Sequence, residues 1–179
     1  MAYTNNFIKA MPYIFLHEGN KFTNIANDAG GPTLYGVSLR FLQSIHEDIN
    51  HDGVVDVLDI KSLTQDEAKD IYFHNFWRIA YDSFQERVAI KVFDVAVNAG
   101  SQRAHILLQR ALNALGSKIT VDGMLGKQTI SEIAKYTDNQ ILQQYCAAQK
   151  AFYQSLVTSN PSQQKFLNGW INRSQWIPA

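Results

Sequence analysis

Two carboxylic acids near the N-terminus, Glu18 and Asp28, are candidates for acid–base chemistry. Hydrolysis of a glycosidic bond needs an acid that protonates the leaving oxygen and, often, a second group that holds the attacking water. Glu18 follows the apolar run Ile14-Phe15-Leu16, so we expect partial desolvation to raise its pKa and keep it protonated. Asp28 and Thr33 come from a glycine-rich segment, and a carboxylate with a hydroxyl can hold one water molecule. The pattern predicts Glu18 as a general acid, with Asp28 and Thr33 positioning water in an inverting arrangement.

The same residues also have a purely structural interpretation. A Glu-Gly pair commonly ends a helix, and an aspartate shortly before two glycines commonly caps a turn. The spacing of Glu18 and Asp28 leaves both interpretations open.

A second candidate site is the acidic loop, residues 48–59. Oxygen-bearing side chains occupy positions 1, 3, 5, 9 and 12 of this segment, and glycine occupies position 6. This is the pattern of a calcium-binding loop, in which position 7 contributes its backbone carbonyl. The expected ligands are Asp48, Asn50, Asp52, Val54 through its carbonyl, Asp56 and Asp59. The loop predicts a structural Ca²⁺ with no catalytic role, and a solvated acidic turn is the alternative.

Helices must position most of these residues. Phe7, Met11, Ile14 and Phe15 recur at helical spacing and predict a helix over residues 5–17, which places Glu18 at its end. Residues 20–36 are rich in Asn, Asp, Gly, Pro and Thr and predict a loop or a short β-ribbon. Thr64 and Glu67 have the Thr-x-x-Glu form of a capping box, which predicts that a helix starts at Gln65. Further helices are expected at 38–46, 65–77, 86–98, 106–115, 127–135, 138–157 and 161–171. The expected fold class is mainly α, with one small irregular or β segment after the first helix.

Bulk composition excludes several classes of protein. Lys and Arg together number 16, as do Asp and Glu, so no global field favours nucleic acid or an anionic membrane. Cys146 is the single cysteine, which excludes an internal disulfide and suits synthesis in a reducing cytoplasm. We expect it to be a packed, inert thiol. We see neither a signal peptide nor a continuous apolar stretch of about 18 residues, so we expect no stable membrane insertion.

Several motifs resemble those of glycoside hydrolase family 108. Glu18-Gly19, followed by Asp28-Ala29-Gly30-Gly31-Pro32-Thr33-Leu34-Tyr35-Gly36-Val37-Ser38, is similar to its Glu-Gly-Gly and Asp-Pro-Gly-Gly-x-Thr-x-Tyr-Gly-Ile signature. Asn20 and Ala29 depart from that signature. Residues 72–78 are similar to the aromatic block that follows in the family. Members are N-acetylmuramidases, found as phage endolysins and as bacterial proteins once labelled secretion activators. The resemblance implies a lysozyme-like fold, Glu18 as the catalytic acid, and Thr33 and Tyr35 in the cleft.

Residues 93–179 resemble the companion C-terminal region of that family, a predicted peptidoglycan-binding domain. The similar pieces include Phe93 to Gly100, Val121-Asp122-Gly123 through Gly126 and Thr129, and Phe166 to Arg173. Asn98 is either a polar contact at a helix end or a sugar-binding amide. We therefore expect a catalytic portion, 1–92, and a C-terminal helical portion, 93–179, packed as one compact unit. Aromatic side chains at helical spacing, such as Tyr72, are expected in the core, so Tyr35 is the aromatic residue assigned to substrate.

The resemblance implies hydrolysis of the β-1,4 bond after N-acetylmuramic acid in bacterial peptidoglycan, without a cofactor for catalysis. Two alternatives stay open: a peptidoglycan-binding protein that does not cut, and a calcium-braced interaction module that aids secretion or phage release. We expect a monomer that is made in the cytoplasm, binds no nucleic acid, and acts on the cell wall after release or export.

Overall fold

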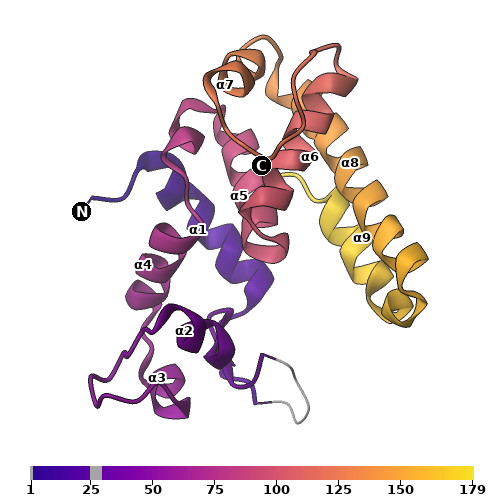
Figure 1. Ribbon diagram of the computed structural model, residues 1–179. Coiled ribbons are helices and arrows are strands. Elements are labelled where there is room, and N and C mark those ends of the chain that lie inside the picture. Colours follow the sequence, from indigo (N-terminus) through magenta and orange to yellow (C-terminus); the bar gives the residue numbers. More distant parts are fainter. Residues whose placement is uncertain (1, 25–29) are drawn as a thin grey trace. The chain divides into compact units, whose positions relative to one another are not determined.

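The computed structural model describes residues 2–24 and 30–179 (Figure 1). Contacts within the chain divide it into two units, which we treat separately: the smaller unit, Met11–Asn75, and the larger unit, Met1–Ala10 with Phe76–Ala179. In the described residues, nine α-helices accompany one two-stranded sheet, which confirms the expectation of a mainly α fold. No helix of this described part combines the length and hydropathy that crossing a membrane requires.

The smaller unit surrounds a short antiparallel hairpin. Its elements are the second half of α1 (Asn5–Glu18), β1 (Thr33–Leu34), β2 (Val37–Ser38), α2 (Leu39–Ile45), α3 (Val57–Ser62) and α4 (Gln65–Asn75). Thr33 pairs with Ser38 and Leu34 with Val37 across the hairpin. The buried apolar side chains of this unit include Ile14, Val37, Leu42, Ile60 and Ile71. The first strand of this ribbon and its turn lie within residues 20–36, for which a loop or a short β-ribbon was predicted, and the second strand lies just beyond them.

Local capping explains where two helices of the smaller unit begin. The Thr64 hydroxyl accepts from the backbone N–H of Glu67 at 3.2 Å, and the Glu67 carboxylate accepts from the backbone N–H of Thr64 at 2.7 Å. This confirms the predicted capping box and the start of α4 at Gln65. Helix α3 was not predicted. It begins because Asp56 and Asp59 form a second capping box at the end of the acidic loop.

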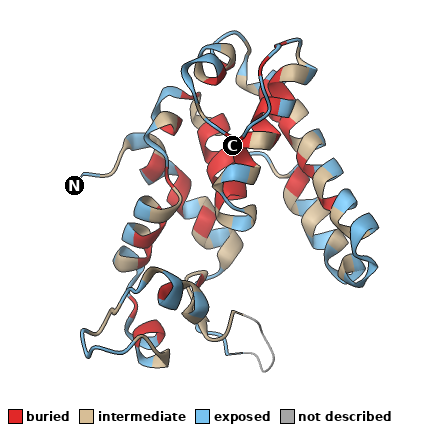
Figure 2. Cartoon of the chain, viewed as in Figure 1, coloured by how far each residue is buried: buried red, intermediate tan, exposed pale blue. Residues whose placement is uncertain are grey.

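The larger unit is a helical assembly built on α5. Its elements are η1 (Ile79–Ser83), α5 (Glu86–Ala99), α6 (Ser101–Ala114), α7 (Lys127–Ile133), α8 (Asp138–Ser159), η2 (Pro161–Phe166) and α9 (Leu167–Gln175). α5 packs on α6, α6 on α8, and α8 on α9. Residues 88–96 of α5 are all buried, and Figure 2 shows buried residues concentrated on α5, α6 and the first part of α8. The expected boundary at residue 92 falls inside this buried helix, whereas the contacts divide the chain at 10/11 and 75/76.

Buried charges attach the C-terminal segment to α5. Lys91, which is fully buried, donates from Nζ to the carbonyl oxygens of Arg173 at 2.9 Å and Trp176 at 2.7 Å. Asp94, also fully buried, accepts from the Arg173 guanidinium at 2.8 and 3.2 Å. The ammonium thus adds a donor to carbonyl groups at and just beyond the C-terminal end of α9, where a helix supplies fewer N–H donors of its own. The Arg173 carbonyl also accepts from the Trp176 N–H at 3.3 Å. The ion pair satisfies the second buried charge on α5.

The segment Asp122-Gly123-Met124-Leu125-Gly126 is held by one buried glutamine of α6. Gln109 donates from Nε2 to Asp122 Oδ1 at 2.8 Å and to the Met124 carbonyl at 3.0 Å, and its Oε1 accepts from the Gly123 N–H at 2.8 Å. Gly123 has φ +78, and a Cβ there would lie 2.9 Å from Cγ of Gln102. The motif that resembles the C-terminal family region is therefore a turn fitted tightly against α6.

Candidate active site and acidic loop

Glu18 is the last residue of α1, as the sequence predicted. Gly19 follows in a left-handed conformation with φ +85, and its N–H donates to the Phe15 carbonyl at 3.0 Å. A glycine in this conformation ends the helix and pairs one of its last carbonyl groups. The Glu18 side chain is partly exposed at this end.

The hairpin turn consists of Tyr35 and Gly36. Both have positive φ, +52 and +77, which is the pattern of a two-residue type I′ turn. Thr23 extends the pairing on the other side of β1, since its backbone and that of Thr33 exchange two N–H to carbonyl hydrogen bonds of 2.9 Å. The turn is therefore supported by backbone pairing on both sides of Thr33.

Gly36 lies directly against Glu18. A Cβ built on Gly36 would be 2.5 Å from Cβ and 3.0 Å from Cγ of Glu18, and it would also overlap the hydroxyl oxygen of Tyr72. No real side chain fits at these distances. The backbone of the turn thus packs on the Glu18 side chain and restricts the directions in which the carboxyl group can point.

Tyr72 of α4 connects the turn to the helical part of the smaller unit. Its hydroxyl donates to the Tyr35 carbonyl oxygen at 2.9 Å. The Phe15 ring meets Tyr35 edge-on at 5.8 Å between centroids and Tyr72 at 6.3 Å. Tyr72 is buried, as expected, but it was not among the residues predicted for the site. Its place in the aromatic block 72–78 was the signal that could have identified it.

Of the other predicted site residues, the structure describes Thr33 and Asn98 but not Asp28. The Thr33 hydroxyl donates to the Gly31 carbonyl at 3.0 Å, which leaves its oxygen as an acceptor. Asp28 lies outside the described residues, so its distance from Glu18 stays a prediction. Asn98 belongs to the larger unit, where its Oδ1 accepts from the Tyr153 hydroxyl at 2.7 Å. This contact is the polar one expected at a helix end, and a sugar-binding role for Asn98 stays a prediction.

The side chains of the acidic loop are bonded mostly to the loop's own backbone. Asp48 Oδ2 accepts from the Gly53 N–H at 2.8 Å, and Asp52 Oδ1 accepts from the Val54 N–H at 2.9 Å. Asp59 is fully buried. Burial raises the pKa of its carboxyl, but donation from the backbone N–H groups of Asp56, Asn50 and Ile49 outweighs burial and holds the pKa below its usual value. Asp59 is therefore a carboxylate that closes the loop on itself.

One oxygen atom of the acidic loop has the surroundings of a cation ligand. Asp48 Oδ1 is buried and has no hydrogen-bond partner among the described residues, although a carboxylate oxygen strongly requires one. In the described part of the chain, no three His, Cys, Asp or Glu side chains converge as metal ligands. Asn50 and the Val54 carbonyl would be further oxygen ligands. Because each carboxylate oxygen has two lone pairs, the oxygens that accept N–H groups here can also ligate a cation.

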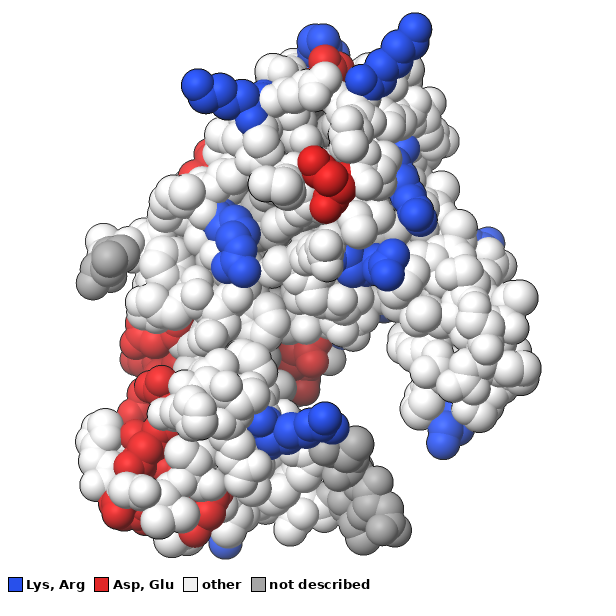
Figure 3. Space-filling view, in the orientation of Figure 1, with Lys and Arg blue, Asp and Glu red and all other residues white. Residues whose placement is uncertain are grey.

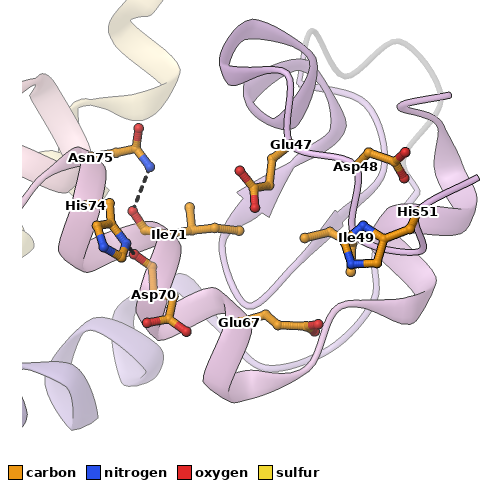
Figure 4. A pocket seen from close by; sticks show the side chains of 9 residues that line it. All are labelled: Glu47, Asp48, Ile49, His51, Glu67, Asp70, Ile71, His74 and Asn75. Carbon is orange, nitrogen blue, oxygen red and sulfur yellow. Dashed lines mark hydrogen bonds between the residues drawn. The ribbon is translucent and has the colours of Figure 1, made fainter. Parts of the chain in front are cut away.

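A hollow of about 470 Å³ adjoins the start of the acidic loop. Glu47, Asp48, Glu67 and Asp70 contribute carboxylates to its lining, with Ile49, His51, Ile71, His74 and Asn75 completing it. Figure 4 shows Glu47 and Ile71 extending toward its centre from opposite sides. The lining has a strongly acidic character.

The balanced charge of the chain conceals an uneven distribution. Residues 11–75 carry 10 acidic and four basic side chains, a formal charge of −6. The larger unit carries six acidic and 12 basic side chains, a formal charge of +6. Figure 3 shows the acidic side chains gathered over the acidic loop and α3. Each unit therefore has an electrostatic field of its own, although the formal charges of the two units sum to zero.

Cys146 has the surroundings of an inert thiol. It is partly buried on α8, and this burial raises the pKa of its thiol above the ordinary value. A raised pKa lowers the fraction of nucleophilic thiolate at neutral pH. Nucleophilic chemistry at Cys146 is therefore disfavoured.

Comparisons with known proteins agree with the fold and the site. The family profile described as Glycosyl hydrolase 108 matches residues 11–100, and the profile described as Predicted Peptidoglycan domain matches residues 103–175. Among solved structures, that of SagA from Brucella abortus matches with a TM-score of 0.73 and 28% sequence identity, covering 94% of this chain and 88% of that one. A search of curated proteins gave no match. The expected mainly α, lysozyme-like fold is confirmed, and the two profiles support a role in peptidoglycan hydrolysis or binding.

Proposed function

Because the chain belongs to the glycosyl hydrolase 108 family, we propose that it hydrolyses the β-1,4 bond after N-acetylmuramic acid in peptidoglycan, with Glu18 as general acid. The observation that carries this proposal is the packing of the Gly36 backbone on the Glu18 side chain. A general acid must be held in one orientation toward the leaving oxygen. The hairpin turn supplies that restraint, and Tyr35 within the turn supplies a ring for contact with substrate.

In the proposed reaction, Glu18 gives its proton to the glycosidic oxygen as the bond from that oxygen to the anomeric carbon breaks. A water molecule attacks the same carbon from the opposite face. The Thr33 oxygen accepts one hydrogen bond from this water, since the hydroxyl hydrogen is directed to Gly31. Asp28 takes the proton that the water loses. The roles of Asp28 and Thr33 rest on the resemblance and on the residue types.

Substitution of the acid tests the proposal. Glu18→Gln keeps the shape of the side chain but removes its proton, so we expect clearing of purified cell walls to fall about 10²- to 10⁴-fold. Glu47→Gln is the matched control, because Glu47 is an exposed acid of the same unit. Mass spectrometry of the digest should show new reducing muramic-acid ends. Equal clearing by wild type and Glu18→Gln would contradict the proposal.

Two other functions predict different results in this assay. A peptidoglycan-binding protein that does not cut would bind walls without releasing reducing ends, whether or not Glu18 is present. A calcium-braced interaction module would have no affinity for walls. In the proposed role, the protein works as a monomer, is made in the cytoplasm, and reaches the wall by release or export.

We also propose that the acidic loop binds a structural Ca²⁺. The buried, unpartnered Oδ1 of Asp48 supports this proposal, as does the series of hard oxygen donors that Ca²⁺ prefers. Asp48, Asn50, Asp52, Asp56 and Asp59, with the Val54 carbonyl, would hold the ion. The ion would neutralise part of the negative charge of the smaller unit and brace the chain between α2 and α3.

Thermal unfolding tests the calcium site. Addition of CaCl₂ to EDTA-treated protein should raise Tm, because a ligand that binds only the folded state stabilises it. Asp48→Asn should reduce this rise, whereas Asp66→Asn should not, since Asp66 is an acid of α4 outside the loop. No calcium-dependent change in the wild-type Tm would exclude the site.

A further inference from the structure

The end of the helical hairpin formed by α8, η2 and α9 has no buried residue. From residue 154 to residue 173, every residue is intermediate or exposed, and Figure 2 shows the contrast with the first part of α8. Large apolar side chains nevertheless occur there, including Phe166, which is 49% exposed. Apolar surface that a chain leaves uncovered marks a binding surface more often than scattered single residues do.

Three rings form a continuous series at this end of the hairpin, which we name the aromatic platform: Tyr153, Trp170 and Phe166. Tyr153 and Trp170 stack with centroids 5.3 Å apart and planes 21° apart. Trp170 and Phe166 follow at 5.6 Å and 32°. The series leads from a buried ring, Tyr153, to an exposed one, Phe166. Trp170 is partly exposed and Phe166 is exposed, and exposed parts of aromatic rings can pack on the C–H faces of sugar rings.

The inner ring of the platform is held firmly. The Tyr153 hydroxyl donates to Asn98 Oδ1 at 2.7 Å and accepts from Gln149 Nε2 at 3.2 Å. Asn98 belongs to α5, so this contact attaches the platform to the core of the larger unit. A rigid surface loses less conformational freedom on binding than a mobile one.

Only basic charges accompany the platform in the C-terminal segment. Residues 139–179 contain Lys150, Lys165 and Arg173 but no Asp or Glu, and Arg173 is paired with Asp94 of α5. Lys165 Nζ lies over the Phe166 ring at 4.9 Å, and the Arg103 guanidinium lies over the Phe152 ring at 4.5 Å. The charge of the larger unit, +6, has the same sign. A ligand that combines sugar rings with carboxylates fits this surface in both shape and charge.

Gly169, inside α9 and next to Trp170, is not required by packing among the described residues. It lacks a positive φ, and a Cβ added there would meet nothing within 4 Å. A glycine in a helix interior is less stable than alanine by about 1 kcal/mol, so neither backbone strain nor packing explains its presence. Gly also serves where a ligand approaches the backbone closely.

We propose that the aromatic platform binds the glycan strand of peptidoglycan. Sugar rings stack on Trp170 and Phe166, Lys165 pairs with carboxylates of the stem peptides, and Gly169 lets the strand approach α9. This inference rests on the proposed function and assigns substrate binding to a surface separate from Glu18. The platform retains the wall polymer while the catalytic residues act on it.

Binding is tested in the full-length Glu18→Gln protein, so that wall material is not consumed. Its affinity for purified, insoluble peptidoglycan is measured by co-sedimentation. We expect Phe166→Ala and Trp170→Ala in this background to weaken binding about tenfold or more. Lys165→Gln should make the binding affinity less dependent on salt concentration. Met124→Ala, which removes another exposed apolar side chain of the larger unit, should bind like the parent. Thermal unfolding of each variant checks the fold.

Gly169→Ala gives an independent test. The substitution should leave Tm unchanged or raise it, because alanine favours the helix, and yet weaken sedimentation with walls. The proposal is overturned if Phe166→Ala and Gly169→Ala both bind like the parent, or if the parent itself does not sediment with peptidoglycan. Loss of the proposed function would be distinguishable, since wild type would then bind walls without releasing reducing ends.

Discussion

The backbone of Gly36 lies against the side chain of Glu18, so close that a methyl group on Gly36 would overlap Cβ and Cγ of the glutamate. These two residues are 18 positions apart and belong to a helix end and a hairpin turn. The contact explains why the turn that follows the first helix carries glycine at its second position: φ is positive there, and no space exists for a side chain.

Gly36→Ala should reduce wall hydrolysis by more than its loss of folding stability alone would explain. The positive φ costs alanine about 1 kcal/mol, and the overlap must also displace Glu18 or Tyr72. We expect a loss in kcat of at least about tenfold in protein that is still folded at the assay temperature. Gly116→Ala is the matched control, because Gly116 has φ +107 but open space around it. If both variants keep wild-type kcat, the turn does not orient the acid.

Tyr72→Phe should loosen the turn without removing the ring. The substitution deletes the hydrogen bond to the Tyr35 carbonyl, which contributes about 0.5–1.5 kcal/mol, and keeps the edge-on contact with Phe15. We expect a modest fall in Tm and a clear fall in kcat. Tyr13→Phe, a tyrosine of α1 with a partly exposed side chain, is the comparison. Equal kinetics in both variants would remove Tyr72 from the site.

His105 should make the stability of the larger unit depend on pH. Its Nδ1 bonds to the Gly123 carbonyl at 2.9 Å and its Nε2 to the Tyr81 hydroxyl at 2.7 Å. Burial lowers its pKa below the ordinary value of 6.5, although the bond to Gly123 opposes this. The unfolded chain therefore takes up a proton at a higher pH than the folded chain. Stability should be full above about pH 6.5 and fall as the pH decreases toward the folded pKa, by about 1.4 kcal/mol for each unit of lowering.

Denaturant unfolding at a series of pH values measures this effect. His105→Gln should flatten the decrease below pH 6.5, because glutamine does not titrate. His74→Gln should leave the decrease unchanged, since His74 is exposed on α4. The same slope in wild type and His105→Gln would assign the decrease to other groups.

Lys91→Met should detach the C-terminal segment. The variant keeps most of the side-chain volume but removes the ammonium that donates to the carbonyl groups of Arg173 and Trp176. A hydrogen bond that involves a charged group contributes about 1.5–3 kcal/mol, so we expect the unfolding free energy to fall by about 2–4 kcal/mol. Hydrogen exchange should quicken first in α9. Unchanged protection of α9 would show that the hydrogen bonds of Lys91 do not hold it in place.

Local features of the sequence determined much of the secondary structure. Apolar spacing and the capping box of Thr64 and Glu67 predicted the helices, because both depend on residues within one or two turns. The same reasoning placed Glu18 at a helix end. It missed α3, because the second capping box, that of Asp56 and Asp59, lies in a segment whose acidic spacing was interpreted as a calcium loop.

Only the tertiary structure decided what surrounds Glu18. Tyr72 is 37 residues from Tyr35, and nothing in the spacing of either indicates that the hydroxyl of one reaches the carbonyl of the other. The same holds for Lys91 and Arg173, and for the rings of Tyr153 and Trp170. The spacing of apolar residues indicates which face of a helix is buried. It does not indicate which helix packs on that face, because burial against one apolar face or another gives a similar hydrophobic free energy. Steric fit and hydrogen bonding select one arrangement, and both depend on residues that are distant from one another in the sequence.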